Sequence, residues 1–271
     1  MRRSHFTFVL VLFVLLVARI TLAQPATAPS EKIWLLHLPG IGGEMRIDHL
    51  FTQGLMQGGI NADLQIYDWT GPDRGMVALM QVKRHEDQST IVAQMIEKHA
   101  REHPDQKIMI TCHSAGAGIA IWALEKLPHD VMVEDLVMVA SALSPPYDLS
   151  KALRHVRHKA YAFNSKLDVL ILSMGTKGFG TVDRVKTDAA GRVGYVMPPN
   201  GDPEQYAKLT QYPYDPDWLR FNNAGEHIGP MMRSFSKNVV ASVLLGKGLP
   251  PRATTAPATT QPATIPATTQ P

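Results

Sequence analysis

The sequence has a single cysteine, Cys112, among its 271 residues. One cysteine excludes an internal disulfide bond and any metal site built from several cysteines. An excess of charge of one sign is also missing once the N-terminal segment is set aside. Lys and Arg number 27 in the whole chain and 24 without Arg2, Arg3 and Arg19, which equals the 24 Asp and Glu. A neutral body offers no electrostatic footprint for nucleic acid, so we expect no nucleic-acid partner.

Two cofactor motifs are missing as well. The zinc motif H-E-x-x-H, with a general-base glutamate directly after the first of two histidines, does not occur, so a zinc hydrolase has little support. The glycine-rich stretch 37–43 is not followed by the lysine of a nucleotide-binding P-loop. We therefore expect neither a metal nor an organic cofactor.

Residues 1–23 have the features of a secretory signal peptide. Two arginines supply the positive start, and the stretch 6–18 contains one polar residue before another arginine interrupts it. This run is too short for a transmembrane helix, which needs about 20 apolar residues. Small residues at 21–23 predict cleavage after Ala23. We expect an exported protein, periplasmic or extracellular, without a stable membrane span after cleavage; a retained N-terminal anchor is the alternative.

Two further segments are rich in Pro, Ala and Thr. Residues 24–30 form a short linker of this kind, and 18 of the 22 residues from 250 to 271 are Pro, Ala or Thr. Such segments have almost nothing to bury and cannot offset the entropy lost on ordering. We expect 249–271 to be a disordered tail, with a glycosylated or wall-spanning spacer as the alternative. The body, 31–248, has an ordinary length for one domain with a sizeable core.

The body alternates apolar, β-rich runs with helical patterns. The runs predict strands at 33–38, 63–69, 107–112, 136–140, 159–163 and 218–222. Helical patterns lie between them at 49–58, 89–103 and 116–127. This alternation predicts an α/β fold, with a mostly parallel sheet of at least six strands and helices on both faces. In such sheets, ligands bind beyond the carboxyl ends of the strands.

The stretch ITCHSAG, residues 110–116, lies at such a strand end. A helix is predicted to begin near Ala115, which would expose the hydroxyl of Ser114 at a sharp turn beside a helix N-terminus. Small residues after Ser114 let strand and helix approach closely. This is the logic of the nucleophile elbow G-x-S-x-G, although Cys112 stands where the motif has its first glycine. A helix N-cap is the alternative role for Ser114.

An acyl-transfer serine also needs an oxyanion hole, which usually includes the amide after the nucleophile. Ala115 supplies that amide. The glycine-rich stretch 37–43 follows the first body strand, and glycines let backbone N–H groups face a cavity. We predict the N–H of Ile41 as the second donor. An ordinary glycine-rich turn is the alternative for this stretch.

Four stretches together resemble the α/β-hydrolase superfamily: LLHLPGIGG, ITCHSAGAG, YAFNSKLDVL and NNAGEHIG. The resemblance covers nearly all of 31–245 and keeps that superfamily's chain order of nucleophile, acid and histidine. It implies an α/β-hydrolase fold and a catalytic triad of Ser114, Asp168 and His227. Asp183 is the rival acid, with a turn or cap residue as its other interpretation.

The resemblance predicts a serine hydrolase that cleaves a small-molecule ester or acyl substrate through an acyl-enzyme, and the signal peptide predicts that it is exported. A serine hydroxyl needs a base within hydrogen-bond reach, and histidine suits this role because its ordinary pKa lies near neutrality. Esterases, lipases, thioesterases and amidases share these residues. A non-catalytic hydrolase-like module that binds a ligand or partner is the alternative.

Three further features are expected near the site. The Met-rich run 76–80 is interpreted as ordinary helix core, with a mobile lip over the site as the alternative. The segment 173–217, rich in Gly, Pro and Asp, is predicted to pass over the carboxyl edge of the sheet and shape an acyl pocket, with a small hairpin at 190–201; a passive surface loop is the alternative. His113 is interpreted as a strand-end histidine packed beside the elbow rather than a substrate contact.

Overall fold

The computed structural model describes residues 32–169 and 180–253. The predicted signal peptide and linker lie outside the described residues, and so does the predicted tail from 254 onward. Within the tail segment that is described, the amide of Ala253 donates a 3.0 Å hydrogen bond to the Asp217 carboxylate. In the described ranges, no helix is both long and apolar enough to cross a membrane.

Six parallel strands form one central sheet in the order β2-β1-β3-β4-β5-β6. Their bounds are β1 Ile33–Leu38, β2 Ala62–Ile66, β3 Ile108–His113, β4 Val133–Val139, β5 Val156–Asn164 and β6 Leu209–Pro213. The central strands β3 and β4 are buried almost throughout, which is why their sequences are continuously apolar rather than alternating. The predicted parallel sheet of six strands is confirmed.

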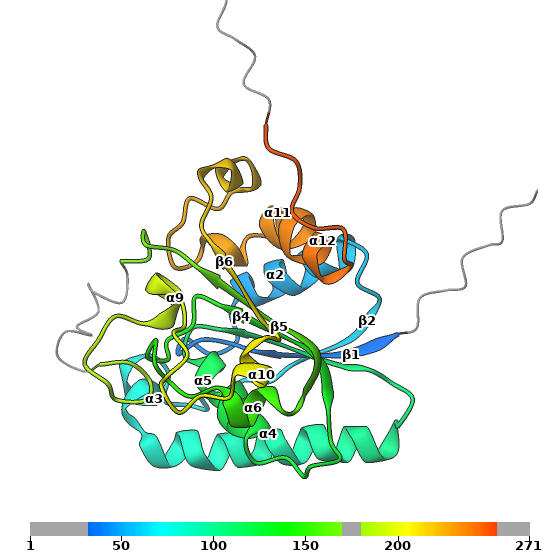
Figure 1. Ribbon diagram of the computed structural model, residues 1–271, viewed down its shortest axis with the longest axis vertical. Helices are drawn as coiled ribbons and strands as arrows, with labels where there is room; N and C mark the ends of the chain where they lie inside the picture. The colour runs from blue at the N-terminus through cyan, green and yellow to red at the C-terminus, as the bar shows by residue number, and fades with distance from the viewer. Residues whose placement is uncertain (1–31, 170–179, 254–271) are drawn as a thin grey trace, which may run out of the picture. The chain divides into compact units, whose positions relative to one another are not determined.

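Helices cover both faces of this sheet (Figure 1). One layer contains α3 Met76–Met80, α4 Val82–Glu102, α5 Gly116–Leu124 and α6 Ser150–Leu153. The other contains α2 Arg46–Gln57, α11 Arg233–Phe235, the π-helical turn η3 Ser236–Val240 and α12 Ala241–Leu244. Each layer closes a separate apolar core against the sheet, the first around Ile96, Ile110 and Leu124. The second surrounds Phe51 and Phe235.

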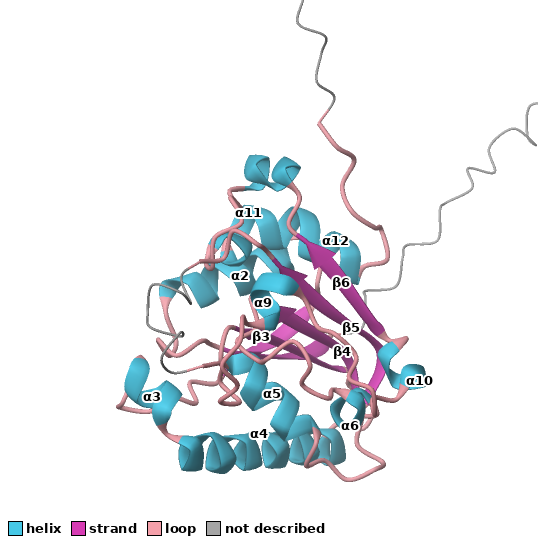
Figure 2. Cartoon of the chain, turned by 60° about the vertical axis from the view of Figure 1, so that its left-hand side comes forward, coloured by secondary structure: helices cyan, strands magenta, loops and turns pink. Residues whose placement is uncertain are grey.

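The connection from β5 to β6 carries the short helices α9 Ala190–Val193 and α10 Pro203–Tyr206, which Figure 2 shows beside the sheet. The predicted hairpin at 190–201 does not form, because the segment opens with a turn of helix. Tyr195 then enters the core, where its hydroxyl lies 2.6 Å from that of Ser141. The Gly and apolar residues that suggested a hairpin therefore form a helical turn, after which the chain places Tyr195 in the core.

The last strand is Leu209–Pro213 and not 218–222 as predicted. Residues Pro216–Phe221 form the 3₁₀ helix η1 instead. The proline at its start lacks the N–H that a strand ladder needs, and the Asp215 carboxylate accepts the amide two residues on at 3.0 Å. Trp218, which gave the segment its strand-like character, packs against aromatic rings of β5 and α11.

Candidate active site

Ser114 stands at the turn between β3 and α5 with a φ of +53°. Residues other than glycine seldom adopt this conformation, which costs on the order of 1–3 kcal/mol and persists only where the surroundings enforce it. Here the Ser114 amide donates to the carbonyl of Val139 at 3.0 Å, and the Ser114 carbonyl accepts the amide of Ala142 at 3.0 Å. The N-cap residue of α5 is Ala115, so the hydroxyl of Ser114 does not cap this helix.

The residues around Ser114 explain how so sharp a turn fits. A Cβ at Gly116 would lie 2.4 Å from the backbone oxygens of Leu38 and Pro39, so only glycine is accommodated there. Cys112, at the first position of the elbow, is fully buried, and its thiol lies 3.4 Å from the carbonyl of Val137. Burial raises the pKa of this thiol, which keeps it protonated. Cys112 is therefore a small buried residue in the place of a glycine.

The structure brings Ser114, His227 and Asp168 into one hydrogen-bonded chain. Ser114 Oγ lies 3.0 Å from His227 Nε2, and His227 Nδ1 lies 2.8 Å from Asp168 Oδ2. A carboxylate only accepts, so Nδ1 carries the hydrogen and Nε2 keeps a lone pair for the serine hydroxyl. Asp168 is 1% exposed, whereas Ser114 and His227 are each 8% exposed. The acid is thus shielded, while the serine and histidine face a cavity.

The two partners of Ser114 come from separate loops. Asp168 follows β5 in a tight turn, where its amide donates to the carbonyl of Ser165 at 2.9 Å. His227 lies in a loop in which the Asn223 side chain accepts the amide of Gly225 at 2.9 Å. The rival acid, Asp183, is engaged elsewhere. Its carboxylate accepts hydrogen bonds from both the amide and the hydroxyl of Ser144, at 2.9 and 2.5 Å, and so clamps a loop.

The glycine-rich loop after β1 packs directly on Ser114. A Cβ at Gly40 would lie 3.2 Å from Cβ of Ser114. The orientation of the loop is fixed by a 2.7 Å hydrogen bond from the amide of Gly75 to the carbonyl of Ile41. Ile41 and Ala115 line the same cavity as the serine. In the part of the chain that the structure describes, neither of their amides donates a hydrogen bond, so both remain available to a ligand.

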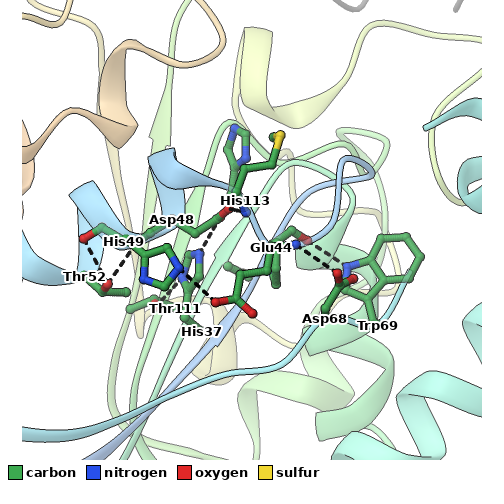
Figure 3. A network of polar contacts seen from close by, with 12 residues as sticks. His37, Glu44, Asp48, His49, Thr52, Asp68, Trp69, Thr111 and His113 are labelled. Atoms are coloured by element: carbon green, nitrogen blue, oxygen red, sulfur yellow. Dashed lines mark hydrogen bonds and ion pairs between the residues drawn. The ribbon is translucent and has the colours of Figure 1, made fainter. Parts of the chain in front are cut away.

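A buried polar group lies next to this loop (Figure 3). His37 Nε2 lies 2.9 Å from Asp48 Oδ1, and His37 Nδ1 lies 2.9 Å from the Thr111 hydroxyl. The other oxygen of Asp48 accepts the amide of Met45 at 2.8 Å. This group ties β1 and β3 to the start of α2. Sequence reasoning missed it, although a histidine inside the run WLLHL, followed by an acid early in the next helix, was a signal.

A cavity of about 290 Å³ opens at Ser114. Apolar side chains dominate its wall, among them Ile41, Met45, Ile47, Met76, Leu79, Ala142, Val182 and Ile228. Among the described lining residues, none carries a carboxylate, an ammonium or a guanidinium group. Such a wall suits an apolar part of a ligand.

Two segments singled out in the sequence contribute to this wall. The Met-rich run is a helix, α3, and its Met76 and Leu79 face the cavity. Residues 180–182, from the predicted excursion, also line it, whereas 173–179 lie outside the described residues. Within 32–169 and 180–253, no three His, Cys, Asp or Glu side chains converge as a metal site requires.

Comparisons with known proteins agree with this arrangement. A family model described as serine aminopeptidase, S33 (Hydrolase_4), matches residues 29–192, which is more than half of the chain and includes Ser114 and Asp168. No curated protein shows significant sequence similarity.

Several solved structures are similar to this chain at low sequence identity. Lipase B of Aspergillus fumigatus is 13% identical with a TM-score of 0.51, over 84% of this chain and 56% of the lipase. The chain thus spans little more than half the length of that lipase. A lipase-esterase related protein from Clostridium acetobutylicum is 12% identical with a TM-score of 0.45, over 81% of this chain and 96% of the other. The esterase domain of a Rhodothermus marinus protein is 10% identical with a TM-score of 0.44, over 80% of this chain and 87% of that domain. Together with the family match, the likeness to the lipase confirms the predicted α/β-hydrolase fold.

Proposed function

Because the chain belongs to the α/β-hydrolase family described as serine aminopeptidase, S33, we propose that it hydrolyses carboxylic esters through an acyl-enzyme on Ser114. One observation carries this proposal: a buried Ser-His-Asp chain with hydrogen-bond lengths of 3.0 and 2.8 Å faces an apolar cavity. Ser114 is the nucleophile, His227 the general base and acid, and Asp168 the group that orients the imidazole.

The chemistry follows from these positions. Ser114 Oγ attacks the ester carbonyl while His227 Nε2 takes its proton, and the amides of Ile41 and Ala115 stabilise the oxyanion. His227 then gives the proton to the departing alcohol, which leaves the acyl group on the serine. Water then attacks the acyl carbonyl while His227 Nε2 takes its proton. His227 returns this proton to Ser114 Oγ, and the carboxylic acid is released. Asp168 holds the imidazole in the tautomer that can accept the serine proton and stabilises the imidazolium as it forms.

The wall of the cavity favours an ester with an apolar acyl group. An aminopeptidase must hold the ammonium group of its substrate, and an isolated ammonium is costly to bury without a carboxylate partner. No described residue of the wall supplies one. Each methylene buried against such a wall contributes about 0.8 kcal/mol, so binding should strengthen with acyl-chain length until the cavity is full.

Labelling by a fluorophosphonate tests the proposal, because this probe needs an activated serine. Wild-type protein should be labelled, and the Ser114→Ala variant, folded to the same melting temperature, should not. A folded wild-type protein that resists the probe would support a non-catalytic binding module instead. A panel of p-nitrophenyl esters of rising chain length then measures the acyl preference. A preference for acetate over all longer esters would contradict an acyl role for the cavity.

Export belongs to the same proposal and rests on residues 1–23 of the sequence, with their positive start and apolar run. We expect a periplasmic or extracellular protein whose mature N-terminus is Gln24 or a close neighbour. Mass spectrometry of protein expressed in a secreting host measures that terminus. Intact Met1 on membrane-associated protein would show a retained anchor instead.

A further inference from the structure

His113, the residue before the nucleophile, contacts the main chain of the histidine loop. Its Nε2 lies 3.2 Å from the backbone carbonyl oxygen of His227, and the two rings are 4.9 Å apart between centroids, inclined at 46°. His113 is only 4% exposed. The mechanism above gives it no part, although it is a buried titratable group in direct contact with the proposed base.

The contact fixes the protonation state of His113. A carbonyl oxygen only accepts, so Nε2 must carry the hydrogen and donate it. In the described part of the chain, Nδ1 has no hydrogen-bond partner, and the position of a Cβ at Gly40 would lie 3.2 Å from it. Burial, reinforced by the neighbouring His227, lowers the pKa of His113 to about 3. His113 is therefore a neutral imidazole with its hydrogen on Nε2 at physiological pH.

We propose that His113 is a positioning residue, whose Nε2–H holds the backbone of His227 while its ring fills the space between that loop and Gly40. The inference rests on the proposed function of Ser114 and His227. The ring of His227 is already oriented at Nδ1 by Asp168, but the carboxylate does not fix the main chain that carries it. A displacement of about 1 Å at a reacting group can cost on the order of 10²-fold in rate. A direct bond from the residue beside the nucleophile restricts such movement.

Two substitutions separate the hydrogen bond from the shape of the ring. His113→Phe keeps a planar ring of similar size and removes the donor, whereas His113→Gln places an amide N–H near the position of Nε2. We expect His113→Phe to lower both kcat on a p-nitrophenyl ester and the rate of fluorophosphonate labelling by about 10- to 100-fold, with little change in KM. His113→Gln should recover most of both rates.

The matched control is His155→Phe. His155 is also buried, at 5% exposure, and its Nδ1 lies 2.9 Å from the carbonyl of Val131, at the amino ends of β5 and β4, whereas Ser114 follows the carboxyl end of β3. This change removes an equivalent bond far from Ser114 and should leave both rates near those of the wild type. Equal rates for His113→Phe and the wild type, or a His113→Gln variant no faster than His113→Phe, would overturn the inference. A wild-type protein that the probe does not label would instead overturn the proposed function.

A second measurement uses the wild-type protein alone and therefore does not require that any variant folds. In ¹⁵N-histidine NMR of the wild-type protein, His113 should be neutral, with a hydrogen on Nε2 and none on Nδ1, at pH 7 and still at pH 5. A hydrogen on Nδ1 alone would contradict the bond to His227, and a cationic ring at pH 5 would contradict the neutral buried imidazole, whether or not the protein is an esterase.

Discussion

His227 Nδ1 lies 2.8 Å from Asp168 Oδ2, across 59 residues of sequence, and this contact selects Asp168 over Asp183 as the acid of the proposed triad. The alternative acid is held by Ser144 through two hydrogen bonds. The two aspartates therefore have separable roles: Asp168 contacts the imidazole of His227, and Asp183 holds the loop that contains Ser144.

Substitution of each acid by asparagine tests this separation. Asp168→Asn should lower kcat by about 10⁴-fold, because the amide can invert the tautomer of His227 without changing the shape of the site. Asp183→Asn should cost about 1 kcal/mol of unfolding free energy through its weakened loop contacts and affect turnover far less. Ester hydrolysis and chemical denaturation are measured on both variants side by side. A larger loss of turnover at Asp183 would move the acid to that residue.

Gly116 offers a test of the turn itself. In Gly116→Ala the new methyl would press on the backbone oxygens of Leu38 and Pro39 at 2.4 Å, where little movement is available. We expect a loss of about 1–3 kcal/mol in unfolding free energy, as is typical of overpacking, together with a fall in kcat because Ser114 is displaced. Gly118→Ala is the control, since the atoms nearest to its methyl would belong to the side chains of Val182 and Trp122, at 2.9 and 3.1 Å, and not to the backbone. Equal stability of the two variants would contradict the close approach at Gly116.

His113 predicts a particular dependence of stability on pH. Because its pKa in the folded protein is lowered, to about 3, the unfolded chain binds a proton that the native state does not bind between about pH 6.5 and pH 3. The contribution of His113 to the unfolding free energy is therefore unfavourable at low pH and grows as pH falls through this window. His113→Gln removes it.

The expected difference in unfolding free energy between the wild type and His113→Gln is largest at acidic pH. Between pH 7 and pH 5, the wild type should lose up to about 2 kcal/mol more unfolding free energy than His113→Gln. Urea titrations of both proteins at the two pH values measure this double difference, which cancels any constant effect of the substitution on stability. Parallel losses in the two proteins would show that the imidazole of His113 is charged or solvated in the native state.

The central strands could be predicted from the sequence because burial on both faces makes them continuously apolar. β1 was predicted at its observed bounds, and β3 and β5 were found within a few residues. β6 was not found. It lies at the edge of the sheet, half-exposed, and its sequence LTQYP has no apolar run. The stronger apolar signal nearby belonged to Trp218, whose burial comes from packing in a 3₁₀ helix.

The grouping of the three candidate side chains could be predicted as far as the resemblance to a known family reached. The resemblance of four stretches to the α/β-hydrolase superfamily, in its order of serine, acid and histidine, implied the three side chains that the structure brings together. The pairing of His37 with Asp48 and the bond from His113 to His227 were not predicted. Both depend on how strand ends and loops meet in three dimensions, which residue type and spacing along the chain do not specify.

The central claim is a covalent acyl group on Ser114, and trapping that intermediate tests it most directly. Wild-type protein mixed with a p-nitrophenyl ester should release a burst of p-nitrophenol stoichiometric with protein. Rapid acid quenching and mass spectrometry should then find the acyl mass on the peptide that contains Ser114. Ser114→Ala should show neither burst nor adduct while unfolding like the wild type. An adduct on another residue, or near-normal turnover by folded Ser114→Ala, would contradict the account.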